Sequence, residues 1–223
     1  MKKIIALAVF CLLPFAACAD GLGVSGKVGT LGVGADLTAS LSDDTLTGRI
    51  GFNQFKFSKT SVQSTVTYNL DLKLQTFEAL ADWYPFQGTF RTTLGLMYNN
   101  NKMDMTGIPT SGSYTVNGVT YPASDVGSLN GNVTFNKIAP YLGIGWGNPV
   151  ASGKGWGFVA DIGVLFQGTP RVNLNAVCNP AIAGTPTCTQ LQSDTQAEVN
   201  KTRSSLSNFN KYPVASAGLS YQF

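Results

Sequence analysis

Ten charged side chains fall at positions that alternate with apolar residues, and they are the residues of this chain best placed to do chemistry. Five are basic and five are acidic: Lys27, Asp36, Arg49, Asp71, Lys73, Glu78, Asp82, Arg91, Lys137 and Asp161. Successive side chains of a strand point to opposite faces, so these charges should share the inner face of a sheet whose outer face is apolar. Their balance predicts mutual ion pairs, completed by hydrogen bonds from Tyr141, Gln75 and Gln167.

The segment from Lys211 to Phe223 shows the strand pattern most clearly. Its apolar face carries Ala215, Ala217, Leu219, Tyr221 and Phe223, and its other face carries Ser216, Gly218, Ser220 and Gln222. This alternation, ending on an aromatic residue, is typical of the last strand of a bacterial outer-membrane β-barrel, with one face toward lipid and one toward a polar lumen. The closing strand of a soluble barrel is the alternative.

Seven further strands complete an all-β fold. The apolar phase changes at Gly29-Thr30, which predicts a two-residue hairpin with Val28 facing Leu31, whereas a bulge in one long strand is the alternative. The phase also slips near Gln75-Thr76, within one of the later segments. Those later strands are expected at residues 45–58, 65–84, 90–105, 133–147, 156–176 and 211–223. We therefore predict a single eight-stranded antiparallel transmembrane β-barrel with short periplasmic turns and longer extracellular loops.

The connections and the aromatic residues orient this barrel. Short connections are expected at 43–44, 85–89 and 148–155, and long ones at 106–132 and 177–210. Every tryptophan flanks a short connection, so one aromatic girdle should lie at the periplasmic rim: Trp83, Trp146, Trp156, Tyr221 and Phe223. A second girdle is expected at the opposite strand ends: Phe55, Phe57, Tyr68, Tyr98 and Phe166.

Residues 1–19 have the three parts of a secretory signal peptide, namely Lys2 and Lys3, an apolar run, and small residues before Asp20. We predict a mature barrel domain at residues 20–223. A lipoprotein box with Cys18 lipidated is the alternative, and either reading exports the chain. No other stretch has the roughly 20 apolar residues of a spanning helix, so the outer membrane is the expected location.

Two cysteines of the mature region lie in one expected external loop. Because export passes through an oxidising periplasm, Cys178 and Cys188 should form a disulfide. Free thiols or a metal site are the weaker alternatives, since the two cysteines lack companion ligands. The segment that follows, residues 193–206, is either a short helix or a mobile part of the loop.

Composition narrows the function classes. Charged residues make up only 12% of the chain, and the mature region has 13 basic and 12 acidic residues, which argues against a nucleic-acid partner. The chain has no histidine, the usual base or proton carrier of catalytic outer-membrane barrels, so we expect no enzyme, cofactor or metal. Eight strands enclose only enough space for side chains, which predicts a filled lumen without a wide pore.

Two segments carry a resemblance to a known family: residues 136–146, NKIAPYLGIGW, and 157–174, GFVADIGVLFQGTPRVNL, with weaker similarity at 68–72, 81–85 and 211–214. In these segments the chain resembles small eight-stranded outer-membrane barrels of the CarO type, which are OmpA/OmpW-like. These segments cover about half of the mature chain. The resemblance implies a barrel without a large open channel, and passage of small cationic amino acids or carbapenem-like drugs.

Two function classes follow. The first is a narrow channel in which Asp36, Asp71 and Asp161 attract a cationic solute while Arg49 and Arg91 yield. The second is a structural or surface-interaction barrel whose loops meet external partners. In both, the expected partners are outer-membrane lipid and lipopolysaccharide, with the barrel-assembly machinery recognising the last strand, and the chain is expected to be a monomer.

Overall fold

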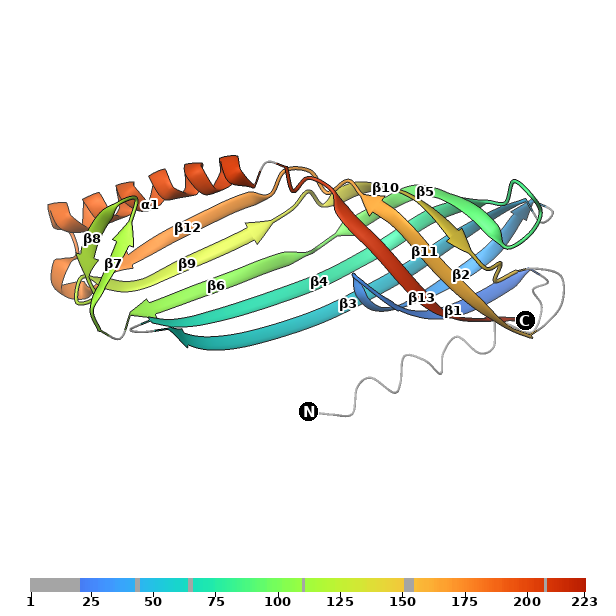
Figure 1. Cartoon of the computed structure of the whole chain (residues 1–223), viewed down its shortest axis with the longest axis horizontal. Coiled ribbons are helices and arrows are strands. Elements are labelled where there is room, and N and C mark those ends of the chain that lie inside the picture. Colours follow the sequence, from blue (N-terminus) through green and yellow to red (C-terminus); the bar gives the residue numbers. More distant parts are fainter. Residues whose placement is uncertain (1–20, 43–44, 64–65, 110, 151–154, 207) are drawn as a thin grey trace.

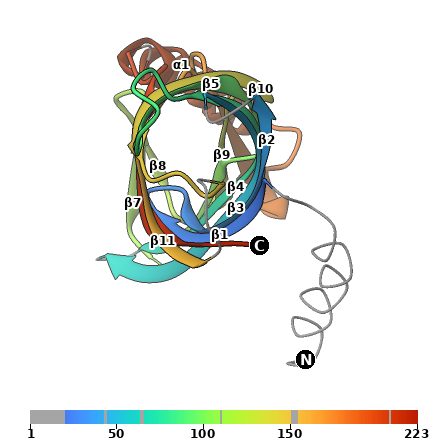
Figure 2. The same ribbon diagram turned by 90° about the vertical axis from the view of Figure 1, so that its right-hand side faces the viewer.

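Eight antiparallel strands form a ring in the computed structural model, which describes residues 21–42, 45–63, 66–109, 111–150, 155–206 and 208–223. Neighbouring strands pair in sequence order around the ring, which closes through β1 with β13 and β4 with β5. Figure 2 shows the ring viewed from its end. Its members are β1 (Leu22–Gly29), β2 (Gly32–Ser42), β3 (Leu46–Gln63), β4 (Val66–Trp83), β5 (Phe90–Asn99), β10 (Ile138–Trp146), β11 (Gly155–Leu165) and β13 (Tyr212–Gln222).

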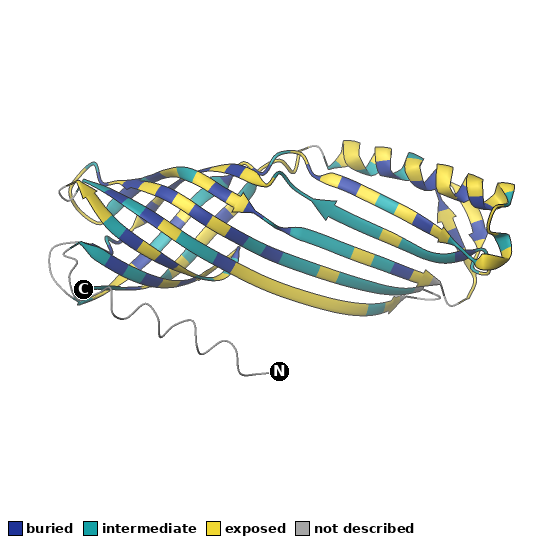
Figure 3. Cartoon of the chain, turned by 180° about the vertical axis from the view of Figure 1, so that it is seen from behind, coloured by how far each residue is buried: buried dark blue, intermediate teal, exposed yellow. Residues whose placement is uncertain are grey.

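Alternation of burial along these strands separates an inner from an outer face (Figure 3). Along β4 the buried positions from Leu74 to Asp82 are all even-numbered, and the odd-numbered Phe77 and Trp83 are exposed. The exposed positions around the ring are largely apolar, including Leu94, Ile144 and Leu219. The predicted eight-stranded antiparallel arrangement is therefore confirmed.

The expected signal peptide, with Cys11 and Cys18, and the expected turn at Asp43-Asp44 lie outside the described residues. Within the part of the chain that the structure describes, no helix is both long and apolar enough to cross a membrane.

Beyond one end of the ring the same sheet continues as a five-stranded extension, which we call the arm. The arm has the strand order β3-β4-β6-β9-β12. It is built from residues 56–63 of β3 and 66–73 of β4, together with β6 (Lys102–Pro109), β9 (Val126–Thr134) and β12 (Arg171–Cys178). Strand β4 pairs with β6 over residues 66–73, in the arm, and with β5 over residues 76–83, in the ring. Three expected strands are therefore each divided in two, at residues 100–101, 135–137 and 166–170.

The expected long loops are consequently ordered structure. The hairpin of β7 (Ser113–Val116) and β8 (Val119–Pro122) lies at the far end of the arm. A short 3-10 helix, Pro180–Ile182, follows β12 in the chain. Helix α1 (Pro186–Ser205) runs along β12, so the expected short helix at 193–206 is present and begins seven residues earlier. Thr185 caps its N-terminus by accepting a hydrogen bond from the Cys188 amide.

Helix α1 packs on the arm through a small apolar cluster. Leu191 is fully buried among Val116, Tyr121, Val126 and Ala176. Next to this cluster the Asp194 carboxylate accepts hydrogen bonds from the Tyr121 hydroxyl at 2.5 Å and the Asn117 amide at 3.2 Å. Burial, together with the hydrogen bond to Asp194, raises the pKa of Tyr121 to about 12.

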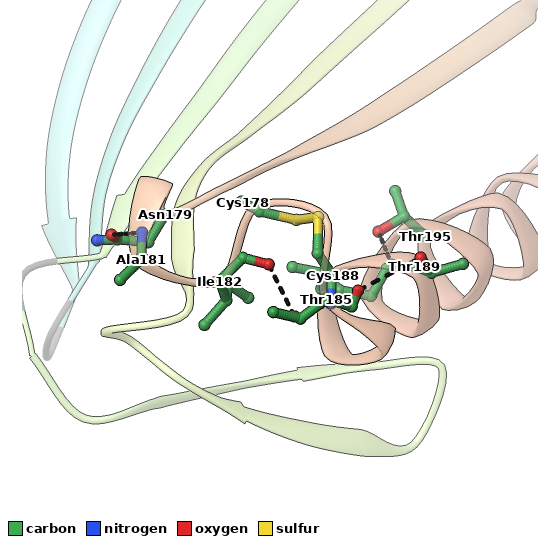
Figure 4. Close-up of a disulfide and its surroundings, with 9 residues drawn as sticks. Cys178, Asn179, Ala181, Ile182, Thr185, Cys188, Thr189 and Thr195 are labelled. Atoms are coloured by element: carbon green, nitrogen blue, oxygen red, sulfur yellow. Dashed lines mark hydrogen bonds between the residues drawn. A yellow bond between two sulfur atoms is a disulfide. The ribbon is translucent and has the colours of Figure 1, made fainter.

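The predicted disulfide between Cys178 and Cys188 is confirmed and joins the end of β12 to the first turn of α1 (Figure 4). Between the two cysteines, Asn179 caps the 3-10 helix by accepting a hydrogen bond from the Ala181 amide. The disulfide therefore ties the helix to the strand that it covers.

The apolar face of the sheet changes sides between the ring and the arm. Strand β4 keeps continuous register with β3 over its whole length, so even-numbered side chains share one face throughout. In the arm this face carries Leu70 and Leu72, whereas the opposite face carries Asp71 and Lys73. The slip expected near Gln75-Thr76 is thus no bulge, because the backbone is regular and only the polarity of the two faces inverts.

This inversion relocates part of the expected second girdle. Phe55, Phe57 and Tyr68 pair with Leu74, Leu72 and Ser61, which puts them on the inner face of the arm. The outward aromatic row is instead Phe52, Phe77 and Tyr98, whose ring centroids lie 4.8 and 6.5 Å apart in that order.

At the opposite rim the five expected girdle residues are partly or largely exposed. Trp156 stacks edge-on against Tyr221 at 5.3 Å between ring centroids, and Tyr221 against Phe223 at the same distance. Trp83 and Trp146 are 55% and 42% exposed. Each tryptophan lies at a strand end on the side of the ring away from the arm.

The first hairpin is present with a different register. Val28 pairs with Val33 and Gly29 with Gly32, so the turn residues are Thr30 and Leu31 and the expected Val28–Leu31 pairing is wrong. Gly32 has φ of 101°, a conformation that glycine adopts at little cost. Leu31 therefore leaves the apolar outer face and turns inward, where it is 4% exposed.

Replacing Cys178 and Cys188 together by serine should loosen the start of α1 and leave the ring intact, because the cross-link closes a loop within the arm only. For a loop of this size we expect a loss of about 2–3 kcal/mol of local stability. Limited proteolysis should cut residues 179–187 faster, while the heat-modifiable electrophoretic mobility of the barrel is retained. Reduced wild-type protein should behave like the variant, and unchanged protease resistance in both would contradict this role.

Candidate functional site

Seven of the ten charges expected in the lumen meet inside the ring, and we call them the lumen charge cluster. They come from six strands and consist of Lys27, Asp36, Arg49, Glu78, Asp82, Arg91 and Asp161. All are nearly inaccessible to solvent, with Arg91 and Asp82 at 1% exposure. Three basic and four acidic groups give the cluster a formal charge of −1.

Arg49 lies at the centre of the cluster. Its guanidinium is 3.1 Å from carboxylate oxygens of both Asp82 and Asp161, and 3.7 Å from Asp36. One planar guanidinium thus joins carboxylates from three other strands, a geometry that its several fixed N–H donors make possible.

Lys27 and Arg91 complete the pairing on either side. The Lys27 ammonium lies 2.6 Å from Glu78 and 2.9 Å from Asp36. Arg91 lies 2.8 Å from Asp161 and 3.6 Å from Asp82. Since burying an ion is costly unless it is paired, this mutual pairing is the condition for the charges to occupy the lumen.

Neutral side chains satisfy remaining acceptor positions. The Asn53 amide donates to Glu78 at 2.8 Å and to Thr76 at 3.2 Å. The Thr93 hydroxyl donates to Asp82 at 2.5 Å. The carboxylates are therefore held by hydrogen bonds as well as by ion pairs, which fixes their orientation.

Glycines directly opposite the charged residues make room for them. Asp36 and Glu78 both pair with Gly51, and Arg91 and Asp161 both pair with Gly145. A Cβ atom at Gly145 would lie 2.8 Å from the Asp161 carboxylate and 2.9 Å from the Arg91 guanidinium. These positions explain why glycine is frequent in strands that are otherwise regular.

Three of the expected lumen charges lie elsewhere. Asp71 and Lys73 are odd-numbered residues of β4, whereas the inner face is even-numbered, so both point outward from the arm. Lys137 lies at the break between β9 and β10, donates to Asn100 and has its ammonium 5.8 Å from the centre of the Tyr98 ring. The expectation that these three line the lumen is wrong.

The expected neutral partners divide in the same way. Tyr141 is buried inside the ring, 2% exposed. Gln75 lies at the junction of ring and arm, where its side chain accepts a hydrogen bond from Asn100. Gln167 is buried at the break between β11 and β12 and donates to the Phe209 carbonyl.

An apolar layer fills the ring on the arm side of the lumen charge cluster. It consists of Leu31, Leu80, Met97, Ala139, Tyr141, Leu165 and Val214, with Tyr212 packed against it. A cavity between this layer and the charges is lined by residues of both, including Lys27, Glu78 and Asp161. The lumen is thus polar at one level and apolar at the next.

Leu31 enters this layer from the first hairpin turn. Hydrogen bonds hold that turn to the last strand: the Tyr212 hydroxyl donates to the Thr30 carbonyl at 2.7 Å, and the Thr30 hydroxyl donates to the Pro213 carbonyl at 3.1 Å. The sequence analysis missed Leu31 as an inward residue because it placed Leu31 in the second strand of the hairpin, on the same apolar face as Val33.

The turn after β10 closes the other end of the ring. Pro149 and Val150 are buried, and the Arg91 guanidinium donates to the carbonyls of Trp146 and Gly147. The lumen is therefore occupied at three successive levels: this turn, the lumen charge cluster and the apolar layer. Among the described residues, no group of three or more His, Cys, Asp or Glu side chains is arranged to hold a metal ion.

Replacing Arg49 by methionine should destabilise the barrel strongly, because three buried carboxylates would lose their shared partner. Breaking a buried ion pair by removing one partner costs about 3–5 kcal/mol. Urea unfolding in detergent, followed by the heat-modifiable mobility shift, measures this loss. The matched control is Arg171→Met in the arm, where the exposed guanidinium donates a hydrogen bond to Asn136, and equal stability of the two variants would contradict the role of Arg49.

Two crystal structures of Acinetobacter baumannii proteins are similar to this chain. CarO is 24% identical with a TM-score of 0.56, and the match covers 91% of this chain and 98% of that one. CarO2 is 21% identical with a TM-score of 0.54 and the same coverage. No family model and no curated protein matches the sequence at a significant level. The chain therefore has the fold of CarO-type outer-membrane barrels, as its residues 136–146 and 157–174 predicted.

Proposed function

We propose that this chain is a bacterial outer-membrane protein with both termini on the periplasmic side and the arm outside the cell. The outer face of the ring supports this placement, since it is apolar between two aromatic rims, as a lipid-facing surface must be. The arm has the opposite arrangement, with polar side chains on its outer face, which suits water. The CarO-like fold agrees with the same placement.

We further propose that the lumen is a narrow path for small cationic, amino-acid-like solutes. The observation that carries this proposal is the composition of the lumen charge cluster, which has one carboxylate more than it has cations. An excess negative charge in a low-dielectric channel attracts a cation. The chemistry needs no more than exchange of partners, because a solute ammonium can take the place of the Lys27 ammonium beside Asp36 and Glu78.

Passage along this path must be slow. The apolar layer and the turn after β10 both block the ring, so a solute crosses only when Leu31 and the buried Val150 move aside. Leu31 is the better candidate for such movement, since it stands on a short turn that would be released when the hydrogen bonds of Thr30 to Tyr212 and Pro213 break.

Neutralising Asp161 should reduce cation uptake and abolish preference for cations. Liposomes containing refolded barrel are incubated with labelled ornithine, alanine or glutamate in the external medium, and uptake is compared with that of liposomes without protein. Wild-type protein should favour ornithine, and Asp161→Asn should lower ornithine uptake about tenfold because the attracting charge is gone. The matched control is Asp104→Asn in the arm, a carboxylate outside the lumen, which should leave uptake unchanged.

The second candidate function is a surface-interaction barrel. It is favoured by the three levels of closure and by the ordered arm with its disulfide and helix. If the correctly folded wild-type barrel transports none of the three probes, the channel proposal fails and this second function stands.

A further inference from the structure

A row of basic side chains crosses the outer face of the arm, and we call it the basic row. The register pairs Lys56 with Lys73 and Lys73 with Lys102, so three lysines stand directly beside one another on three adjacent strands. The same level continues through Thr134 to Arg171 on the last two strands of the arm. With strands about 4.8 Å apart, four cations lie within roughly 20 Å along one line.

Paired residues of antiparallel strands point to the same side of the sheet, so the basic row faces outward with Phe77 and Tyr98. Lys73 and Phe77 are four residues apart on the same strand, which is about 13 Å along it. One polar level, Gln54 and Gln75, separates the two rows. The basic row thus lies two same-face levels above the outward aromatic row, in the region where a lipid headgroup is expected.

Carboxylates of the chain compensate the basic row only in part, since Asp71 and Asp104, which pair with each other two residues along the same face, are two against four cations. Like charges directly opposite each other destabilise a sheet, and Lys73 has a lysine on both sides. Lys102 is partly compensated, because its ammonium lies 2.8 Å from Asp104. Among the described residues, neither Lys56 nor Lys73 forms a salt bridge, so an anion supplied from outside the chain would relieve the repulsion.

The level of the row identifies the anion. Acyl chains would cover the apolar face below it, and the group that follows them at this height in the outer leaflet is a phosphorylated sugar headgroup. We propose that the basic row is a binding site for the phosphate groups of lipid A. This inference rests on the membrane placement proposed above and is independent of transport through the lumen.

Binding to lipid A tests the site directly. Refolded protein in neutral detergent is titrated with bisphosphorylated lipid A and, separately, with dephosphorylated lipid A. The row variant combines Lys56→Gln, Lys73→Gln and Lys102→Gln. The matched control combines Lys59→Gln, Lys201→Gln and Lys211→Gln, which removes the same charge away from the row: Lys59 pairs with Leu70 and Lys201 bonds Asn117.

Wild type and control should prefer the phosphorylated lipid, and the row variant should lose this preference by about 100-fold, or about fivefold for each lysine. The proposal is overturned if the row variant binds phosphorylated lipid A as wild type does, or if wild type does not distinguish the two lipids. Equally tight binding of inorganic phosphate alone would also overturn the proposal, because the site would then bind a soluble anion.

A single variant guards against misfolding of the triple one. In detergent without lipid A, Lys73→Gln should raise the Tm by removing repulsion, and with lipid A present it should have a lower Tm than wild type. If Lys73→Gln changes the Tm in the same direction with and without lipid A, the proposed site is contradicted. Failure of the membrane placement itself would be seen differently, as wild-type protein that does not insert into bilayers at all.

Discussion

In the membrane placement proposed above, the structure depends on one constraint, which is that a single sheet passes from lipid into water without a break in its backbone. Strand β4 belongs to both parts of the sheet, because it is hydrogen-bonded to β3 along its whole length, to β5 in the ring and to β6 in the arm. In lipid every backbone group must be paired within the protein, and the closed ring meets that need. In water an open sheet is allowed, so the arm can end in an edge.

The same constraint decides what fills the ring. A polar lumen inside a lipid-facing barrel must be satisfied by its own side chains, and Arg49 does so by joining carboxylates from three strands. The glycines opposite these side chains supply the space, so the position of Gly145 is as necessary to the pairing of Arg91 with Asp161 as the charges are. An ion-pair cluster of this kind stabilises the ring, and under the proposed transport function its members are the partners that a charged solute would exchange with.

Much of the ring could be predicted from local pattern, because period-two alternation and the position of the tryptophans depend only on neighbouring residues. The arm could not, since its strands were counted as continuations of ring strands or as loops. The shift of polarity near Gln75 resembles a bulge in the sequence, and this resemblance misplaced Asp71 and Lys73 in the lumen. The basic row was invisible for a further reason: only the register brings Lys56, Lys73 and Lys102 together.

The two edges of the arm are protected differently. Along β12 the side chains of Gln196 and Arg203 from α1 donate to the carbonyls of Leu174 and Val172, so the helix covers the edge. Beyond Gln54, strand β3 pairs only with β4, and its other edge is open. Charged residues such as Lys59 at an open edge discourage pairing with a second chain. Lys56 lies on the same edge, so a phosphate bound at the basic row would add a bulky headgroup to that side of the arm and keep neighbouring barrels apart.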